Sequence, residues 1–399
     1  MIEPERSRKA PIVGLALCIV VVGACDGEAG QSGFSARDSA GVAIVESSSA
    51  AWAAGEGFTV APDPTLDLSA TGSGTDHEFY GVTDGVRLSD GALVLSEAST
   101  SQIKYYSAGG EYLGSFGREG EGPGEFRRIR MIDVLPGDTI VAYDARNVRV
   151  TKIGPDRQMV GETALTQQFI TRVAAFAPGV MLVGLGSTEA VDSGDGHQRW
   201  PRHYVRVTDD GGVIDTILVG RGSESVSLDG GTIDAAPFFG RDTYVAIHGE
   251  HVYLGDSDSL EVRTYTTEGR LTRQARVMGF DLGDVEAQAA AEAALREEIR
   301  PANRRINEML PIPTRRPAYA NILVDPEGYV WAAEHKGRFR NMLDDAPFEW
   351  QVFDPDGVWL GAVEIPGRFQ VFEIGEDYVL GLRRDDIDVE RPQLLRLNR

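Results

Sequence analysis

One pattern occurs three times in this chain, and it constrains the fold more than any other feature of the sequence. Each copy has a short β-type segment, a loop that leads to a Phe, and then a pair of β-type segments joined by a turn. The copies begin at residues 65–69, 112–116 and 217–222; the second has the glycine-rich loop 117–126, and the third is looser. Strands and turns that recur every ~40–60 residues predict a β-propeller.

The turns between the predicted strands indicate how the strands pair. Residues 85–88 and 92–95 flank Ser89-Asp90-Gly91, where glycine supplies the positive φ of a hairpin turn. Four strands in an up-and-down meander form one blade, and the segments along the chain predict six blades. The sixth has only three strands of its own, so we expect residues 65–69 to complete it and close the ring. The predicted fold class is all-β, a six-bladed β-propeller whose last blade is closed by an N-terminal strand.

One segment departs from the strand pattern. Residues 284–310 are rich in Ala and Glu, and their apolar residues recur at helical spacing, as at Leu295 and Ile299. Asp284 can cap the first turn, and Pro301 would interrupt or kink the helix. The segment predicts a helical insertion of one or two helices between blades 4 and 5.

The N-terminus has the features of an export signal. A basic start is followed by the apolar stretch 11–24, which at 14 residues is too short to span a bilayer comfortably. The stretch ends in Val22-Gly23-Ala24-Cys25, which resembles the lipobox of bacterial lipoproteins. We therefore expect residues 1–24 to be a lipoprotein signal peptide and Cys25 to be the lipid anchor. The alternative is an ordinary signal peptide with a chance cysteine.

The cysteine count agrees with lipidation. Only Cys18 and Cys25 occur, and Cys18 lies in the segment that would be removed, so the mature chain would keep one thiol. A thioether at Cys25 would consume that thiol and leave neither a disulfide nor a cysteine-based metal site. Residues 25–41, rich in Gly, Ser and Ala, predict a flexible tether, and residues 42–399 the propeller. These features predict a lipid-anchored protein outside the cytoplasm, in the bacterial cell envelope, with the choice of membrane open.

The net charge disfavours two kinds of partner. Loss of residues 1–24 takes away three basic and two acidic groups, so 39 basic and 61 acidic residues become 36 and 59, a net charge of −23. Such a surface repels nucleic acid and anionic lipid headgroups. We therefore expect no nucleic-acid binding, and contact with the membrane through the lipid anchor alone.

Three segments together resemble a known family. The run 117–126, the helical segment before Pro317-Ala318-Tyr319 and the ending 374–381 are similar to the six-bladed β-propeller family of exported bacterial proteins and lipoproteins, related to NHL-repeat propellers. The resemblance covers residues 40–399 and implies the fold. The family has no agreed activity and no set of catalytic residues, so the resemblance assigns none here.

Motifs that suggest metal or phosphate binding have simpler explanations. His248 and His251 lie three residues apart, but they bracket a strand–turn–strand, where ligands at that spacing converge poorly, so we interpret them as solvated turn residues. The glycines of 117–124 resemble a nucleotide loop, yet no Gly-Lys-Ser/Thr and no helix follow. We interpret that loop as a crossing between blades, and we predict no cofactor and no metal site.

A basic cluster gives the one candidate binding site. Within an acidic chain, several arginines occur in and after the helical segment, and those we take as ligand-binding candidates are Arg300, Arg304, Arg305, Arg315 and Arg316. One interpretation is that they are surface partners of acidic residues, each contributing little. The other is an anion site at the rim of the funnel, since guanidinium groups suit carboxylates or sulfates.

No motif for a nucleophile, metal or cofactor occurs, so the sequence favours a binding or scaffold protein over an enzyme. Its partner would be another protein or a small anionic ligand, and we expect a monomer. The alternative is an NHL-like hydrolase or lyase that holds a metal in the central funnel with Asp, Glu or His from several blades. Such ligands would come from distant positions that a single sequence does not connect.

Overall fold

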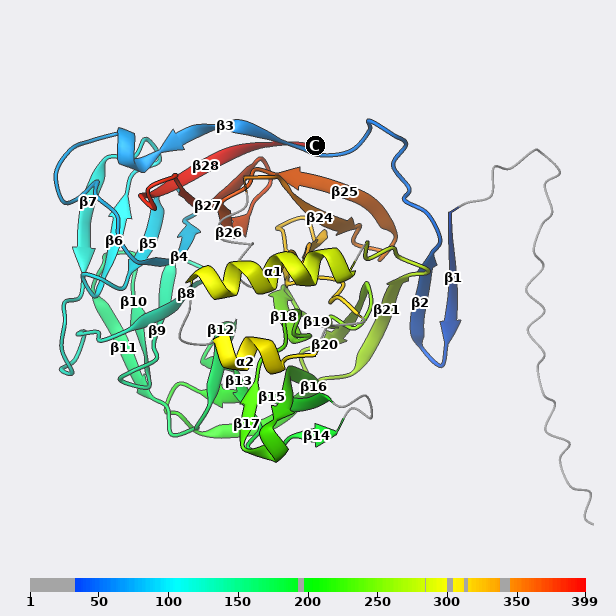
Figure 1. Cartoon of the computed structure of the whole chain (residues 1–399). Helices are drawn as coiled ribbons and strands as arrows, with labels where there is room; N and C mark the ends of the chain where they lie inside the picture. Colours follow the sequence, from blue (N-terminus) through cyan, green and yellow to red (C-terminus); the bar gives the residue numbers. More distant parts are fainter. Residues whose placement is uncertain (1–32, 193–196, 284, 300–303, 312–314, 338–344) are drawn as a thin grey trace, which may run out of the picture. The chain divides into compact units, whose positions relative to one another are not determined.

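The computed structural model describes residues 33–192, 197–283, 285–299, 304–311, 315–337 and 345–399, all of which lie in one unit of the chain, Gly33–Arg399. This unit is mainly β-structure, and its described residues form six sheets (Figure 1). Segments rich in Val, Ile, Leu and Tyr form the strands, because such side chains pack well on a pleated surface. Glycine and aspartate gather in the turns, where they tolerate or cap unusual backbone conformations.

Three sheets are four-stranded meanders in chain order, as the repeats predict. They contain β4 (Val82–Arg87), β5 (Leu93–Glu97), β6 (Gln102–Tyr106) and β7 (Tyr112–Phe116); β8 (Ile129–Leu135), β9 (Thr139–Asp144), β10 (Arg149–Ile153) and β11 (Met159–Ala164); and β22 (Asn321–Val324), β23 (Val330–Ala333), β24 (Phe348–Phe353) and β25 (Trp359–Ile365). In each of them the first strand is innermost and the fourth is at the outer edge.

Two sheets have more strands. One contains β12 (Ile170–Ala177), β13 (Val180–Gly186), β15 (His197–Thr208), β16 (Val213–Leu228) and β17 (Ile233–Ala235), with β14 (Val191–Asp192) paired to β15. The other contains β18 (Thr243–His248), β19 (His251–Asp256), β20 (Glu261–Thr266) and β21 (Leu271–Val277), followed by β2 (Val42–Ser47) and β1 (Phe34–Ser39). The long strands β15 and β16 extend beyond the meander, and β14 and β17 pair with these extensions.

The last sheet joins the C-terminal strands to a strand from the N-terminal part of the chain. It contains β26 (Phe369–Ile374), β27 (Tyr378–Arg384), β28 (Glu390–Asn398) and β3 (Thr59–Asp67). The predicted pairing of residues 65–69 with the C-terminal strands is confirmed, with Leu66 opposite Leu394. The strand boundaries differ from the prediction, since β3 begins at Thr59 and a 3-10 turn follows it at Leu68–Ala70. Pro62 and Pro64 did not end the strand because an edge strand tolerates missing N–H donors.

The predicted flexible tether is wrong over part of its length. Residues 25–32 lie outside the described residues, but Phe34–Ser39 form β1, which pairs with β2 through a turn at Ala40 and Gly41. The sequence gives no signal for β1 because all six of its side chains are exposed. Its partner β2 pairs in parallel with β21, and this pairing supplies the edge on which β1 forms.

The N-terminal segment follows the outer edges of three neighbouring sheets. After β2, the amides of Ala51 and Trp52 donate to the carbonyls of Trp359 and Leu360 in β25, at 3.1 and 2.8 Å. The chain then enters β3 at the outer edge of the last sheet. These contacts cover strand edges that would otherwise expose unpaired backbone groups.

The described residues between β21 and β22 form two helices, α1 (Val285–Ile299) and α2 (Arg304–Met309). Residues of both helices pack on the extended sheet, where Ala293 and Ile306 contact a cluster that contains Val226 and Phe238. The predicted helix cap Asp284 and the predicted break at Pro301 lie outside the described residues. Neither described helix combines the length and the hydropathy needed to cross a membrane.

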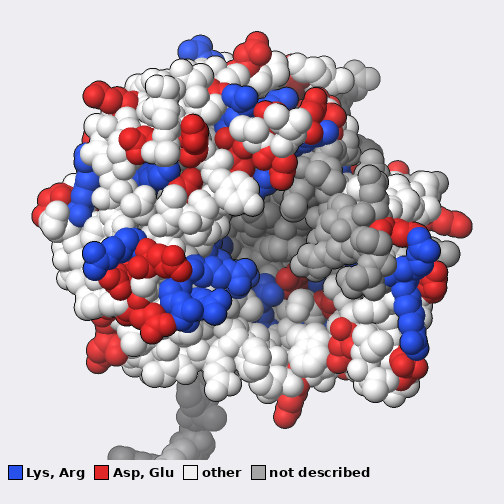
Figure 2. Space-filling model, turned by 60° about the vertical axis from the view of Figure 1, so that its left-hand side comes forward, with Lys and Arg blue, Asp and Glu red and all other residues white. Residues whose placement is uncertain are grey.

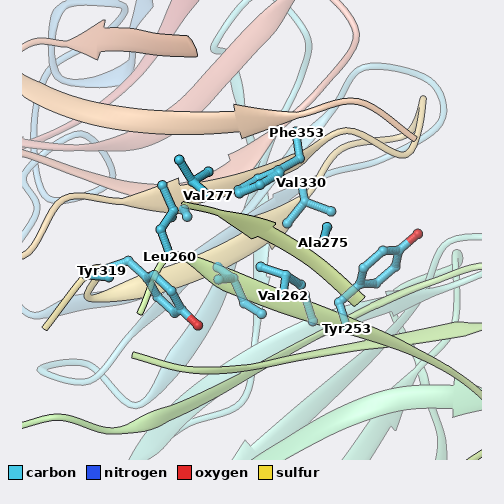
Figure 3. Packing of buried hydrophobic residues seen from close by; sticks show 12 residues of the cluster. Tyr253, Leu260, Val262, Ala275, Val277, Tyr319, Val330 and Phe353 are labelled. Carbon is cyan, nitrogen blue, oxygen red and sulfur yellow. The ribbon is translucent and has the colours of Figure 1, made fainter. Parts of the chain in front are cut away.

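Apolar side chains fill the spaces between neighbouring sheets (Figure 3). Val262 and Ala275 from the sheet of β20 and β21 belong to one cluster with Val330 and Phe353 from the next sheet. Tyr319 is fully buried among them and donates its hydroxyl to the carbonyl of Glu261 at 2.8 Å. Each such large side chain contributes about 1.5–3 kcal/mol through its burial, so sheet-to-sheet packing is a main source of stability.

The two ends of the sheets carry different connections. The turns from the first to the second strand of a sheet, and from the third to the fourth, are short. The β4–β5 turn contacts the β8–β9 turn of the next sheet, where the amide of Ser89 donates to Asp138 at 3.0 Å. The connections from second to third strand, and from each sheet to the next, leave from the opposite end and include β14, β17, α1 and α2. We call these the short-turn face and the long-loop face.

Candidate functional site

The innermost strands of all six described sheets line one central cavity of about 310 Å³. Sheets that surround a common cavity in this way have the arrangement of a β-propeller. The ionisable side chains of the cavity wall are Asp84 on β4, Asp133 on β8, Arg172 on β12 and Glu373 on β26.

Two of these carboxylates make the same contacts on successive sheets. Asp84 accepts hydrogen bonds from the amide of the following residue, at 2.9 Å, and from Ile132 on the next sheet, at 3.1 Å. Asp133 repeats this arrangement, with the amide of the following residue at 2.8 Å and that of Ala175 on the next sheet at 2.9 Å. An innermost strand has one unpaired edge, and these carboxylates satisfy donors on that edge.

Glu373 makes a third contact of this kind. It accepts the amide of Arg87 on the neighbouring β4 at 2.8 Å, and its other oxygen accepts the hydroxyl of Tyr378. Burial raises the pKa of Asp84 to about 7, and it also raises the pKa of Asp133 and of Glu373. All three carboxylates therefore join one sheet to the next in a poorly solvated space.

Potential metal ligands and charge are two further features of the same wall. No group of three or more His, Cys, Asp or Glu side chains able to hold a metal occurs in the described parts of the chain. Arg172 brings a positive charge to the same wall and opposes the raised pKa of Asp84 and Asp133. Its buried Nε has no hydrogen-bond partner among the described residues. The central cavity can hold the sheets together, but it offers no three-ligand cation site there.

A second cavity, of about 340 Å³, lies at the long-loop face. Its wall is formed by β16, by the start of β18 and the segment before it, by the residue before β22, and by a residue just after β23. The lining residues are Ser223, Glu224, Ala236, Pro237, Phe238, Gly240, Arg241, Asp242, Tyr244, Ala320 and His335. Helix α1 supports this wall, because the buried Arg296 donates to the carbonyls of Ala236 and Pro237 at 3.3 and 2.8 Å.

The charged groups of this second cavity are paired with one another. Arg241 donates its amide and its Nε to Glu224 at 2.9 and 3.0 Å, and its Nη1 to Asp258 at 3.0 Å. Burial opposes ionisation of Glu224, but the bonds from Arg241 outweigh it and lower the pKa of Glu224. Arg202 pairs with Asp242 at 3.0 Å, although burial still raises the pKa of Asp242. A buried network of this kind is stable only because each charge has a partner.

Two neutral polar groups complete the second cavity. His335 is 7% exposed, and its Nδ1 accepts the amide of Gly337 at 3.2 Å. Burial, and then the positive charge of Arg316, lower the pKa of His335 to about 4, so the ring is neutral and its proton is on Nε2. Burial also raises the pKa of Tyr244 well above its ordinary value, which keeps its hydroxyl protonated.

The structure does not bring the predicted arginines together in one described cavity. Arg304 pairs with Glu297 at the surface. Arg316 is buried, donates to Gln288 at 2.6 Å and lies 3.6 Å from Glu334. Arg305 and Arg315 are exposed, and Arg300 lies outside the described residues, as does the predicted anchor Cys25.

Sequence reasoning missed the groups that line both cavities. Asp84 and Asp133 carry a weak signal, since each is an acid within a strand of apolar residues at a similar place in its repeat. His335 stands alone in the sequence, and nothing in its spacing points to the cavity. His248 and His251 lie opposite each other in the hairpin of β18 and β19.

Surface charge is mixed rather than uniformly acidic. Figure 2 shows acidic and basic side chains side by side, with a group of basic ones beside a hollow. Arg127, Arg128 and Arg146 lie together at one end of β8 and β9, because their amides all donate to the carboxylate of Asp144. Arg127 pairs with Glu121, whereas the guanidinium groups of Arg128 and Arg146 form no ion pair within the described ranges.

No protein-family profile and no curated protein match this chain. Similar solved structures include an exported protein from Bacteroides fragilis, with 14% identity, a TM-score of 0.48, and coverage of 86% of this chain and 95% of that one. Regucalcin, a calcium-binding protein from Agrobacterium tumefaciens, has 9% identity, a TM-score of 0.41, and coverage of 84% and 95%. Virginiamycin B lyase from Staphylococcus aureus has 10% identity, a TM-score of 0.41, and coverage of 86% and 100%. At these TM-scores the similarities carry no conclusion about this chain.

Proposed function

We propose that this chain is an exported binding protein, a six-bladed β-propeller that takes its ligand or partner at the long-loop face. The segment 284–310 is then a helical insertion between blades 4 and 5, and β3 completes the sixth blade. One observation supports the proposal above all: both described helices, β14, β17 and a ligand-sized cavity belong to the long-loop face, whereas the short-turn face has only tight turns. Loops and insertions on a rigid scaffold commonly carry binding sites.

Binding at this face is favoured over the alternative, a hydrolase or lyase with a metal in the central funnel. In that funnel Asp84, Asp133 and Glu373 already have a structural role, since each accepts a hydrogen bond from a backbone amide of the neighbouring sheet. Of the predicted anion-binding residues, Arg305 and Arg315 are exposed and suit an acidic group on a partner protein. We propose a monomer without a cofactor.

The test is a ligand-observed NMR screen of the full chain against neutral, cationic and anionic small molecules, followed by hydrogen–deuterium exchange with each hit. We expect protection at the long-loop face and recovery of the ligand chemically unchanged. Protection confined to the short-turn face, or turnover of the ligand, would contradict the proposal.

Anchoring is a separate part of the proposal and has its own test. We propose that lipidated Cys25 holds the protein in the cell envelope, with no other contact with the membrane. Cys25→Ser should then release the protein from membranes and abolish its labelling by a fatty-acid analogue. A wild-type chain that carries no lipid, or a variant that stays on the membrane, would refute the anchor.

A further inference from the structure

The cavity of Glu224, Arg241, Tyr244 and His335 has the size of a small-molecule site. Its volume of about 340 Å³ is at the lower end of the range for ligand pockets, which suits a small molecule such as a monosaccharide. Apolar groups form part of the wall, among them Phe238, whose ring lies 4.9 Å from the guanidinium carbon of Arg296. The cavity therefore combines an apolar surface with polar groups, as binding sites do.

The charges in its wall do not call for a charged ligand. Arg241 is shared between Glu224 and Asp258, and Arg202 is bound to Asp242. Asp258 also pairs with Arg199 and Arg221, at 3.2 and 3.3 Å. A ligand with a net charge would have to compete with these existing pairs for its partner. An uncharged ligand avoids that competition.

Two polar groups remain for a ligand. The Nε2–H of His335 has no hydrogen-bond partner among the described residues, and the same holds for the hydroxyl of Tyr244. His335 is more than nine-tenths buried, and its ring is fixed by the amide of Gly337 and by an edge contact with Phe239 at 5.7 Å. Since neither group is used by a described residue, a ligand that accepts from them gains hydrogen bonds.

We propose that this cavity binds a small uncharged ligand with carbonyl or hydroxyl acceptors, of the N-acetylated sugar kind, whose acceptors meet His335 Nε2–H and the Tyr244 hydroxyl. The inference rests on the proposed function, because it names the ligand class taken at the long-loop face. Helix α1 has a positioning role, since Arg296 holds the segment Ala236–Phe238 that forms one wall.

The experiment is calorimetric titration of the full chain with N-acetylglucosamine, using glucosamine as the cationic control and glucuronate as the anionic one. We expect saturable binding of N-acetylglucosamine alone. Tyr244→Phe removes one hydrogen bond and should weaken binding about fivefold to tenfold. Tyr105→Phe is the matched control, because the Tyr105 hydroxyl is buried without a partner on β6, in another sheet.

His335 is tested by a pair of variants. His335→Leu should weaken binding about as much as Tyr244→Phe, whereas His335→Gln keeps an N–H donor and should retain most of the affinity. Thermal melts check that each variant is folded. Equal affinity of Tyr244→Phe and Tyr105→Phe, or no saturable binding of N-acetylglucosamine to the wild type, would overturn the inference.

The outcomes also separate this inference from the proposed function. Should glucuronate bind at the long-loop face while N-acetylglucosamine does not bind, the ligand class is wrong and the proposed function stands. Conversion of the sugar, or protection confined to the short-turn face, would contradict the proposed function itself.

Discussion

The two cavities of this protein contain the same kinds of side chain but use them differently. In the central cavity, Asp84 and Asp133 accept backbone amides from the neighbouring sheet. In the cavity at the long-loop face, Glu224 and Asp242 accept from arginines, and the neutral groups of Tyr244 and His335 remain available. The carboxylates of the central cavity thus serve the fold, although Arg172 Nε there has no partner among the described residues, whereas the second cavity keeps two neutral groups for a ligand.

The largest loss of stability is expected when the ion network of the second cavity is broken. Arg241→Met leaves Glu224 buried beside too few positive charges, so we expect a loss of about 3–5 kcal/mol in the free energy of unfolding. The double variant Glu224→Leu/Arg241→Met removes both charges and should recover at least half of that loss. Denaturant unfolding measures both. A loss below about 1 kcal/mol for the single variant would show that the pair is not essential.

The next effect concerns pH and the central cavity. Burial raises the pKa of Asp84 from 3.8 to about 7, so the folded state holds this proton more tightly than the unfolded state. The resulting stabilisation is fully present below about pH 4 and is lost as pH rises toward about 7; three pKa units limit it to about 4 kcal/mol. Between pH 4 and 7, the wild type should lose more stability than Asp84→Asn. Parallel pH profiles for the two proteins would contradict the raised pKa.

A somewhat smaller loss is expected when a tie between sheets is removed. Asp133→Ala leaves the amides of Ala175 and of the residue after Asp133 without their acceptor, at a cost of about 2–4 kcal/mol. Asp386→Ala is the control, since that side chain is 91% exposed and should change stability by less than about 0.5 kcal/mol. Chemical denaturation compares the two variants, and equal losses would rule out a structural role for the tie.

The smallest effect on stability is expected in the second cavity. Tyr244→Phe removes a hydroxyl that has no partner within the described residues, so the free energy of unfolding should stay within about 0.5 kcal/mol of the wild type. A thermal melt measures the change. A larger loss would indicate that the hydroxyl supports the fold, which would weaken its assignment to a ligand.

The sequence predicts the repeated meanders and the helical segment because their signals are local. It also predicts that β3 pairs with β28, since the repeat places residues 65–69 in a blade position. It does not predict β1, whose side chains are all exposed. Strand pairing at an outer edge depends on which neighbour is present, and a single sequence does not provide that information.

The polar contacts of both cavities could not be predicted from the sequence either, because their partners are far apart along the chain. Asp84 accepts from the amide of Ile132, which is 48 residues away in the sequence, and Asp133 accepts from that of Ala175, which is 42 residues away. The sequence shows a cluster of arginines in an otherwise acidic chain, but the cluster does not form one anion site. Arg296 donates to a backbone carbonyl, and Arg316 lies beside Glu334.

The most direct test of the different roles of the two cavities is the affinity of Asp133→Asn and Tyr244→Phe for N-acetylglucosamine, measured side by side by calorimetry under conditions in which both are folded. The account predicts that Asp133→Asn binds like the wild type, because its carboxylate only joins two sheets, and that Tyr244→Phe binds about fivefold to tenfold more weakly. The reverse result, with affinity lost in Asp133→Asn and kept in Tyr244→Phe, would place the ligand in the central cavity and contradict the account.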